Sequence, residues 1–334
     1  MKNERIVECD WIRAIAALAV ILYHYTYRYP VLFHSNIDYK ITVVYGAAGV
    51  NIFFFLSGFL GLYSVNEKTK CVDYMKRRFN RLYPEYWMCM LITAIVLSLF
   101  FNELFLGWKI VLFNVTMLQG FIGVSNLDGA YWTLAYELRF YIFIFVVIAS
   151  KKLKHIKSIC ILWIIISMTV FFLSNFISST LIIKLMEYII MPKYCAPFVA
   201  GIFVYLLKNR LDDVWCYFGL ILSFISSFLM QEPSYFFALL VIVVIMISVF
   251  VLRNKCDRYK EFILKASNTK CNPLIYIAQI SYPVYLLHQY IGYAILQKIE
   301  NKGFNNEIFI ILPIVVVFML AHIVNKVLKK GEII

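Results

Sequence analysis

The chain has 334 residues, of which 62% are hydrophobic and only 15% are charged, and its mean hydropathy is +0.78. An average soluble domain is about 45–50% apolar, so a single soluble core cannot bury this much apolar side chain. The net charge of +13 would suit a nucleic-acid binder in a soluble protein, but here the basic residues lie between long apolar runs. The composition therefore excludes a cytosolic nucleic-acid binder, a disordered chain and a disulfide-stapled secreted module. It predicts a protein whose solvent is lipid.

Ten segments are apolar and long enough to cross a bilayer, which takes about 20 residues. In chain order they are 11–29, 42–63, 83–101, 130–149, 159–178, 185–207, 214–230, 234–252, 272–297 and 307–328. The predicted fold class is an all-α polytopic membrane protein with about ten transmembrane helices. A further apolar stretch, 104–121, carries Lys109 and Asn114 and is expected to be an interfacial or re-entrant segment.

The basic residues predict the orientation of these spans. Most of the 32 Lys and Arg fall on one side, above all in loops 64–82 and 253–271, if the N-terminus is cytoplasmic. Both termini are therefore expected in the cytoplasm. The eight Cys form no C-x-x-C pair and none lies in an outer loop, so reduced thiols and no metal site are expected. We expect 1–334 to be a single integral-membrane domain without an appended soluble domain.

Ionisable side chains within the predicted spans indicate a functional site, because a charge near the bilayer centre costs about 2.5–3.5 kcal/mol. Arg13 and His24 are eleven residues apart in the first span, which places them on one helix face, about 16 Å apart. Helical rise places His24 at a depth in the outer half similar to that of Glu137, Lys193 and His288. A lone buried His is more often a satisfied core residue, but a layer of four such groups favours a site.

A basic cluster, residues 76–81, precedes the third span. Within it Arg78 and Arg81 suit bidentate contacts with phosphate groups. The alternative is a plain positive-inside loop, which explains most basic segments beside a membrane.

Five short motifs occur in a fixed order along the chain and resemble acyltransferase family 3. They are Arg13-x10-His24, the run GVNIFFFLSG at 49–58, Arg78-x-x-Arg81-Leu82-Tyr83-Pro84, YWTLAYE-x-x-FY at 131–141 and SYPVYLLH at 281–288. Members of this family are bacterial integral-membrane O-acyltransferases that modify surface glycans such as O-antigen. The resemblance implies ten membrane helices, a cytoplasmic acyl-CoA donor, usually acetyl-CoA, and an acceptor hydroxyl outside the membrane.

The family's site residues transfer onto this chain one by one. The resemblance places the arginine and histidine of the first helix at Arg13 and His24, and the paired arginines at Arg78 and Arg81. It places the tryptophan and glutamate at Trp132 and Glu137. The chain has Arg139 where relatives often have Gln or Lys, which leaves the role of that position open.

Acyl transfer from a thioester to an alcohol needs a base, a group that stabilises the oxyanion and a site for the CoA phosphates. We expect His24 to be the general base and Glu137 to orient or charge-stabilise its imidazole. Lys193 or His288 would polarise the thioester carbonyl. The remaining assignments are phosphate contacts by Arg13, Arg78 and Arg81, and substrate contacts by Trp132 and Tyr141.

The predicted function is thus O-acetyl transfer to an extracytoplasmic glycan in the bacterial cytoplasmic (inner) membrane. The expected partners are acyl-CoA, a glycan or lipid-linked glycan and membrane lipid, with no nucleic acid, no metal and no permanently bound cofactor. The alternative is a polytopic transporter or exporter of glycan precursors, in which the buried His, Glu and Lys form a proton relay. A scaffold that uses the fold without chemistry is a third possibility.

Overall fold

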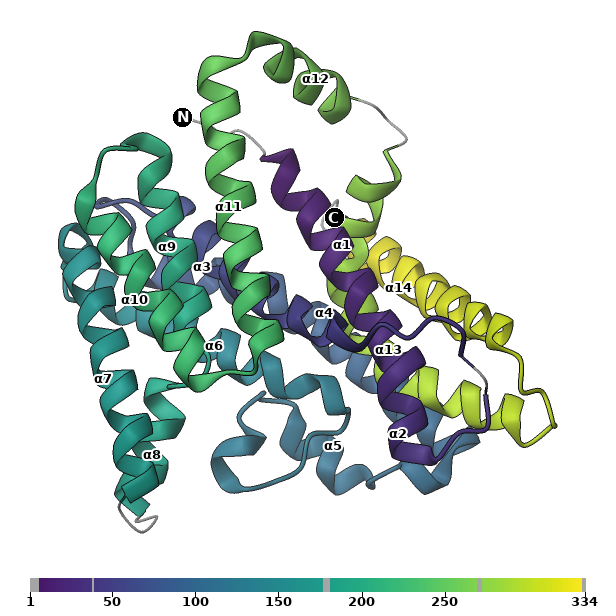
Figure 1. Ribbon diagram of the computed structural model, residues 1–334. Coiled ribbons are helices and arrows are strands. Elements are labelled where there is room, and N and C mark those ends of the chain that lie inside the picture. The colour runs from purple at the N-terminus through teal and green to yellow at the C-terminus, as the bar shows by residue number, and fades with distance from the viewer. Residues whose placement is uncertain (1–5, 38, 177–180, 269–271, 332–334) are drawn as a thin grey trace. The chain divides into compact units, whose positions relative to one another are not determined.

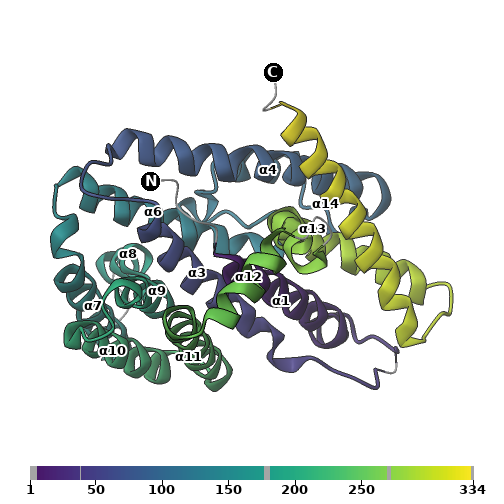
Figure 2. The ribbon, with the colours of Figure 1, turned by 90° about the horizontal axis from the view of Figure 1, so that it is seen from above.

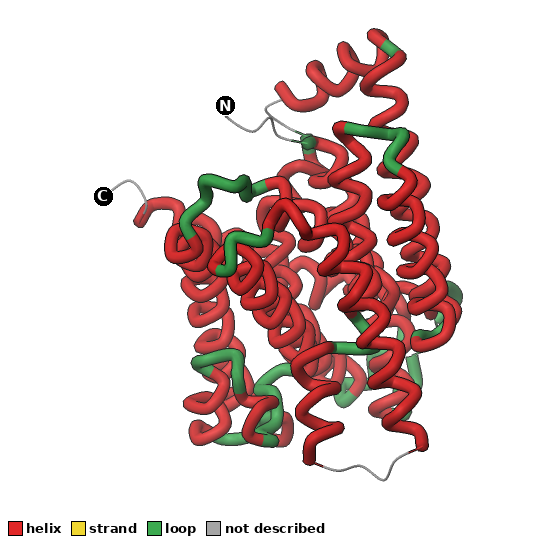
Figure 3. The backbone as a smooth tube through the Cα atoms, turned by 90° about the vertical axis from the view of Figure 1, so that its left-hand side faces the viewer, coloured by secondary structure: helices red, strands yellow, loops and turns green. Residues whose placement is uncertain are grey.

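The computed structural model describes residues 6–37, 39–176, 181–268 and 272–331, and every regular element in these ranges is helical (Figure 3). The α-helices are labelled in Figure 1: α1 (Val7–Tyr23), α2 (Tyr29–Phe33), α3 (Gly49–Tyr63), α4 (Cys71–Phe100), α5 (Trp108–Asn114), α6 (Trp132–Ala149), α7 (Ile156–Phe176), α8 (Leu181–Ile190), α9 (Cys195–Asn209), α10 (Val214–Met230), α11 (Pro233–Lys255), α12 (Asp257–Asn268), α13 (Pro273–Glu300) and α14 (Ile311–Gly331).

Seven helical segments of the described residues are long and apolar enough to cross a membrane. They are Val44–Tyr63, Cys71–Phe100, Gly129–Ala149, Leu153–Phe176, Leu181–Lys208, Pro233–Lys255 and Glu307–Leu328, and each overlaps one of the ten predicted spans. The other three predicted spans, 11–29, 214–230 and 272–297, differ for local reasons. The α-helix in the first ends at Tyr23, α10 has only 17 residues, and α13 carries Gln279, His288 and Gln289 among its apolar residues.

The segment 104–121 is not a single helix. It consists of the end of a short 3₁₀ turn (Asn102–Leu104), the seven-residue helix α5 and the start of a second 3₁₀ turn (Gln119–Ile122). A helix of seven residues rises only about 10 Å, too little to cross a bilayer. Its buried end is held by Asn114, whose side chain donates to Ser125 O and accepts from Leu127 N.

The chain divides into two compact units. The first unit is Met1–Ile12, Ala48–Lys76 and Tyr136–Asn272, and the second is Arg13–Ala47, Arg77–Ala135 and Pro273–Ile334. The first unit therefore contains α3 and α7–α12, and the second contains α2, α5, α13, α14 and most of α1 and α4.

Close backbone contact between α3 and α9 forms the core of the first unit, and Figure 2 shows α9 beside α3, α10 and α11. A Cβ atom on Gly58 would lie 2.0 Å from Phe198 O, and one on Gly201 would lie 2.1 Å from Phe55 O. Small residues at such crossings let membrane helices approach backbone to backbone, where dispersion contacts replace the hydrophobic driving force that lipid does not provide. Phe198 then stacks on Phe54 and Phe140, with ring centroids 4.7 and 4.5 Å apart.

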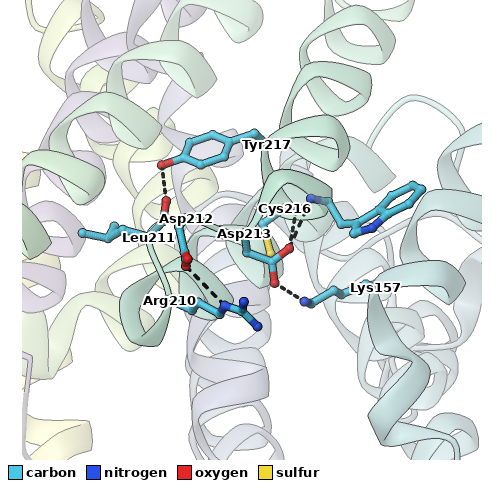
Figure 4. A network of polar contacts seen from close by, with 8 residues as sticks. Lys157, Arg210, Leu211, Asp212, Asp213, Cys216 and Tyr217 are labelled. Atoms are coloured by element: carbon cyan, nitrogen blue, oxygen red, sulfur yellow. Dashed lines mark hydrogen bonds and ion pairs between the residues drawn. The ribbon is translucent and has the colours of Figure 1, made fainter.

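Polar contacts hold the ends of the helices in this unit. Asp213 caps α10 by accepting from Trp215 N and Cys216 N, and it forms an ion pair with Lys157 at the start of α7 (Figure 4). The Lys157 ammonium lowers the pKa of Asp213, so this contact stabilises the fold above the usual aspartate pKa and is lost as pH falls through the lowered value. Elsewhere in the unit, buried Glu8 accepts from Nε and Nη2 of Arg253 at 2.9 and 2.6 Å, and it also accepts from Tyr259 OH.

Helices α13 and α14 pack together in the second unit. Two carboxylate side chains, Glu300 and Glu307, form hydrogen bonds that hold the loops of this unit. Glu300, the last residue of α13, accepts from Tyr29 OH, from Ser35 Oγ at 2.6 Å and from Asn36 N at 2.9 Å. Glu307 accepts from Lys40 N at 2.8 Å. These bonds tie the segment after α2 to the α13–α14 connection.

We expect Gly58→Ala to destabilise the first unit sharply, because its Cβ would meet a backbone oxygen that cannot move away without separating α3 from α9. The matched control is Gly61→Ala on the same helix, where the Cβ would meet only the ring edge of Phe140, at 3.0 and 3.3 Å. Because alanine favours a helix by about 0.5–1 kcal/mol over glycine, the control should be close to neutral. Thermal unfolding of both purified variants in detergent measures the difference in stability. Equal melting temperatures would contradict the close backbone contact between α3 and α9.

Candidate functional site

The first helix changes its hydrogen-bonding register at His24. Residues His24–Arg28 form a π-helical turn between α1 and α2, with Tyr25 and Thr26 buried. Thr26 Oγ1 donates to Leu22 O at 2.7 Å and accepts from Val43 N at 2.9 Å. Single π turns inside helices cost stability and occur frequently at functional sites. This turn brings the His24 ring to α13 within the second unit.

The structure brings His24 and His288 into contact in the second unit. Their ring centroids are 4.7 Å apart with the planes at 80°, and His288 Nε2 lies 3.2 Å from His24 Nδ1. His288 is fully buried, whereas His24 is partly exposed. The two histidines that the sequence placed at similar depth are thus neighbours.

Carbonyl acceptors determine the tautomer of both rings. His288 Nδ1 lies 2.6 Å from Tyr285 O, and a carbonyl oxygen can only accept, so this nitrogen carries the proton. The neutral ring then has its lone pair on Nε2. His24 Nδ1 lies 2.9 Å from Val20 O and therefore also carries a proton, which it shares with His288 Nε2. His24 Nε2 is left with a lone pair, and among the described residues it has no hydrogen-bond partner.

The α13 turn that carries His288 is anchored by its neighbours. Tyr25 OH donates to His288 O at 2.7 Å, and Gly292 accommodates the Tyr25 ring, since a Cβ there would lie 2.2 Å from the tyrosine oxygen. Tyr285 OH lies 3.0 Å from Thr133 Oγ1. These contacts fix the backbone and the ring of His288 together.

Asp128 is a further anchor of this turn. It is completely buried, and its two oxygens accept from Ala130 N at 2.8 Å and from Tyr290 N at 2.9 Å. Burial raises the pKa of Asp128 to about 7, and the two N–H groups act in the opposite direction. One carboxylate therefore joins the start of α6 to α13, two residues after His288.

The predicted phosphate ligands belong to the second unit, and they differ in exposure. Arg78 and Arg81 lie on α4 one turn apart, so they share a face of that helix. Arg78 is 7% exposed, whereas Arg81 is exposed and Arg13 on α1 is intermediate. A buried guanidinium is unusual for a simple positive-inside loop, whose basic side chains extend into water. Trp132, at the start of α6, is partly exposed in the same unit.

Glu137 lies in the first unit, so the structure does not place it relative to His24. Its Oε1 accepts from Ser57 Oγ of α3 at 2.7 Å and from Tyr141 OH, one turn later on α6. Tyr141 is 1% exposed. Tyr141 therefore orients Glu137, and its contact with substrate stays a prediction.

Lys193 also lies in the first unit, in the non-helical link between α8 and α9 that interrupts the predicted span 185–207. Its side chain is exposed, and its carbonyl accepts from Gln231 Nε2 at 2.6 Å. Gln231 also accepts from Asn51 Nδ2 at 2.9 Å, and Asn51 is fully buried. In the described residues no contact joins Lys193 to Glu137.

Arg139 has a structural explanation. Its guanidinium lies 4.1 Å from the ring centroids of both Tyr136 and Tyr188, and Nη1 donates to Tyr188 O. A desolvated cation between two aromatic faces is stabilised by the ring quadrupoles. Arg139 therefore connects α6 to α8 within the first unit.

Several residues of the site have a structural role that the sequence motifs alone do not reveal. Tyr25, Thr133 and Tyr285 all hold the His288 turn, and Ser57 holds Glu137. The available signal was position: each lies beside, or about one turn from, an ionisable residue or inside a quoted motif. No group of three or more His, Cys, Asp or Glu that could bind a metal occurs in the described part of the chain.

Comparison with known proteins gives one family and one curated relative. The family model described as "Acyltransferase domain" matches residues 6–324. A peptidoglycan O-acetyltransferase, OatA, of Listeria monocytogenes is 28% identical over an alignment of 171 residues, and the match covers 44% of this chain. That match spans 25% of the relative's length, so the chain matches about a quarter of the relative. No solved structure matches the chain.

Asp128→Asn should destabilise the second unit. In either orientation the amide presents one NH2 group to a backbone N–H, so Ala130 N or Tyr290 N loses its acceptor. A buried donor left unpaired costs about 1–3 kcal/mol. Thermal unfolding should show a lower midpoint for Asp128→Asn, while the exposed control Asp212→Asn stays within about 0.5 kcal/mol of the parent. Identical midpoints for the two variants would argue against the bridge.

Proposed function

The chain belongs to the acyltransferase family, and from this premise we propose that it is a membrane O-acetyltransferase. The donor is cytoplasmic acyl-CoA, with acetyl-CoA the simplest case, and the acceptor is a hydroxyl of an extracytoplasmic glycan. The curated relative, named for O-acetylation of peptidoglycan, supports a glycan acceptor. The proposal includes O-antigen or another surface polysaccharide as the acceptor. It also places the protein in the bacterial inner membrane, with both termini in the cytoplasm.

The observation that carries the proposal is the fixed tautomer of His24. An acceptor hydroxyl has to lose its proton as its oxygen attacks the thioester, and this proton needs a positioned base. His24 Nδ1 is occupied by Val20 O and His288 Nε2, so the lone pair on Nε2 is the available one. His24 is also the less buried of the two histidines, so it is the one of the pair that is open to solvent and substrate.

His288 then acts mainly by orienting His24. Its Nδ1–H is held by Tyr285 O and its Nε2 accepts from His24, so neither nitrogen is directed at a ligand in this arrangement. We retain Glu137 as a separate functional group, held by Ser57 and Tyr141, whose charge supports the reaction. Polarisation of the thioester carbonyl by Lys193 also remains a proposal.

We assign to Arg78 and Arg81, with support from Arg13, the binding of the phosphate groups of the donor. The guanidinium is planar and offers paired N–H donors that match phosphate oxygens, which ammonium does not. Their one-turn spacing on α4 allows both to reach a single diphosphate. A transporter is not favoured, because the family match covers residues 6–324 and gives acyl transfer as the reaction class.

His24→Ala should abolish acetylation, because the variant lacks the base, and the protein should still fold because the imidazole is partly exposed. The measurement is mass spectrometry of the surface glycans from cells that carry the parent, the variant or no copy of the chain. The expected result is loss of the acetyl increment in the variant, with unchanged membrane insertion. Full acetylation by a well-inserted His24→Ala protein would refute the base assignment.

Acetyl-CoA should raise the thermal midpoint of the purified protein, and Arg81→Ala should reduce that rise. Arg81 is exposed, so its removal should leave the ligand-free midpoint unchanged. For buried Arg78 the informative change is Arg78→Lys, which keeps the charge and loses bidentate geometry. Saturating ligand at about 100 times Kd stabilises by about 2.7 kcal/mol, so weaker binding is readily detected. Equal rises of the thermal midpoint in the parent and the variants would show that these arginines do not bind the donor.

A further inference from the structure

Tyr293 stands beside the proposed base. It lies on α13 five residues after His288, and its ring centroid is 6.2 Å from that of His24. Tyr29 and Phe33 complete its surroundings, with ring centroids 5.6 and 5.5 Å away. All five residues belong to the second unit.

The hydroxyl group of Tyr293 differs from those of the neighbouring tyrosines. The side chain is fully buried, and its oxygen has no hydrogen-bond partner among the residues that the structure describes. By contrast, Tyr25 OH donates to His288 O, Tyr29 OH donates to Glu300 and Tyr285 OH meets Thr133 Oγ1. The site therefore contains a buried phenol group that the described residues do not satisfy.

Packing does not explain this oxygen. Contacts with Tyr29, Phe33 and His24 are ring contacts, which phenylalanine would make equally well. A buried polar group without a partner carries an uncompensated desolvation cost, and native proteins retain few of them. The ring that carries this unpaired oxygen lies 6.2 Å from the ring of the proposed base, so a ligand bound at the base is close enough to supply the missing partner.

We propose that Tyr293 is a further catalytic residue, whose hydroxyl donates a hydrogen bond to the acyl carbonyl oxygen during transfer. This inference rests on the proposed function. The acceptor oxygen bonds to the thioester carbon, its proton passes to His24 Nε2, and the carbonyl electron pair moves to the oxygen that Tyr293 contacts. The intermediate then reforms the carbonyl and breaks the C–S bond, and the departing thiolate takes the proton from His24. Tyr293 keeps its own proton throughout.

A donor of this kind acts mainly on the transition state, because the oxygen gains its charge only there. The test is Tyr293→Phe in membranes that contain the full chain and the cell's own acceptor. Radiolabelled acetyl-CoA is the probe, and label in the glycan fraction is counted at several donor concentrations. We expect kcat to fall by about 10²–10³-fold, the range found when one oxyanion donor is removed, with KM for acetyl-CoA nearly unchanged. The thermal midpoint should stay the same or rise, because an unpaired hydroxyl is lost.

The matched control is Tyr86→Phe, which removes the hydrogen bond of a buried hydroxyl to Asn114 O, 2.7 Å away, elsewhere in the second unit. It should lower the midpoint and leave the transfer rate unchanged, the reverse of the Tyr293 profile. An unchanged rate in Tyr293→Phe, a fall of its midpoint, or a rise of KM alone would overturn the inference. Absence of label with the parent chain would instead refute acetyl-CoA-dependent transfer itself.

Discussion

The hydrogen atom on His24 Nδ1 is the element on which the whole site depends. Val20 O and His288 Nε2 both accept this hydrogen. His288 Nε2 has a lone pair for it only because Tyr285 O holds the proton of His288 on Nδ1. A chain of carbonyl, imidazole, imidazole and carbonyl thus leaves a single lone pair available. No ionised side chain is needed within this chain of contacts to define which nitrogen is basic.

This arrangement places demands on α13. The helix contains Pro283, which cannot donate to the ladder, and three of its later backbone groups bond outside it or to a side chain. Those groups are Tyr285 O, His288 O and Tyr290 N. Each carbonyl oxygen has two lone pairs, so Tyr285 O and His288 O accept these bonds while α13 remains helical. His288, one of the polar residues that lower the hydropathy of α13, is therefore the one that forms the site.

The sequence predicted the helical class, seven of the spans that the structure shows and both histidines of the contact in the second unit, but not the tyrosines around them. Hydropathy succeeded where a span is one uninterrupted apolar helix, as in Pro233–Lys255. It could not predict the π turn at His24, because a π turn has no periodicity of its own within five residues. It also ran one span across Lys193, although Pro192 marks the break there: proline cannot donate to the helix ladder, and Met191 before it has a positive φ of 56°. Depth along a helix places a residue in a layer, but only tertiary packing determines which neighbours it meets.

The same physical reasoning explains why a pair of histidines suits the proposed step. When His24 takes a proton at Nε2, both of its nitrogens become donors, and the Nδ1–H bonds to Val20 O and His288 Nε2 become charge-assisted. Such bonds are roughly twice as strong as neutral ones, so the protonated base is stabilised by dipoles already in position. Buried dipoles do not have to reorganise as the charge appears, which is the condition under which electrostatic stabilisation accelerates a reaction. A carboxylate in place of His288 would hold the imidazolium more strongly and return its proton to the departing thiolate less readily. The neutral imidazole of His288 therefore lets His24 take the proton in the first half of acyl transfer and release it in the second.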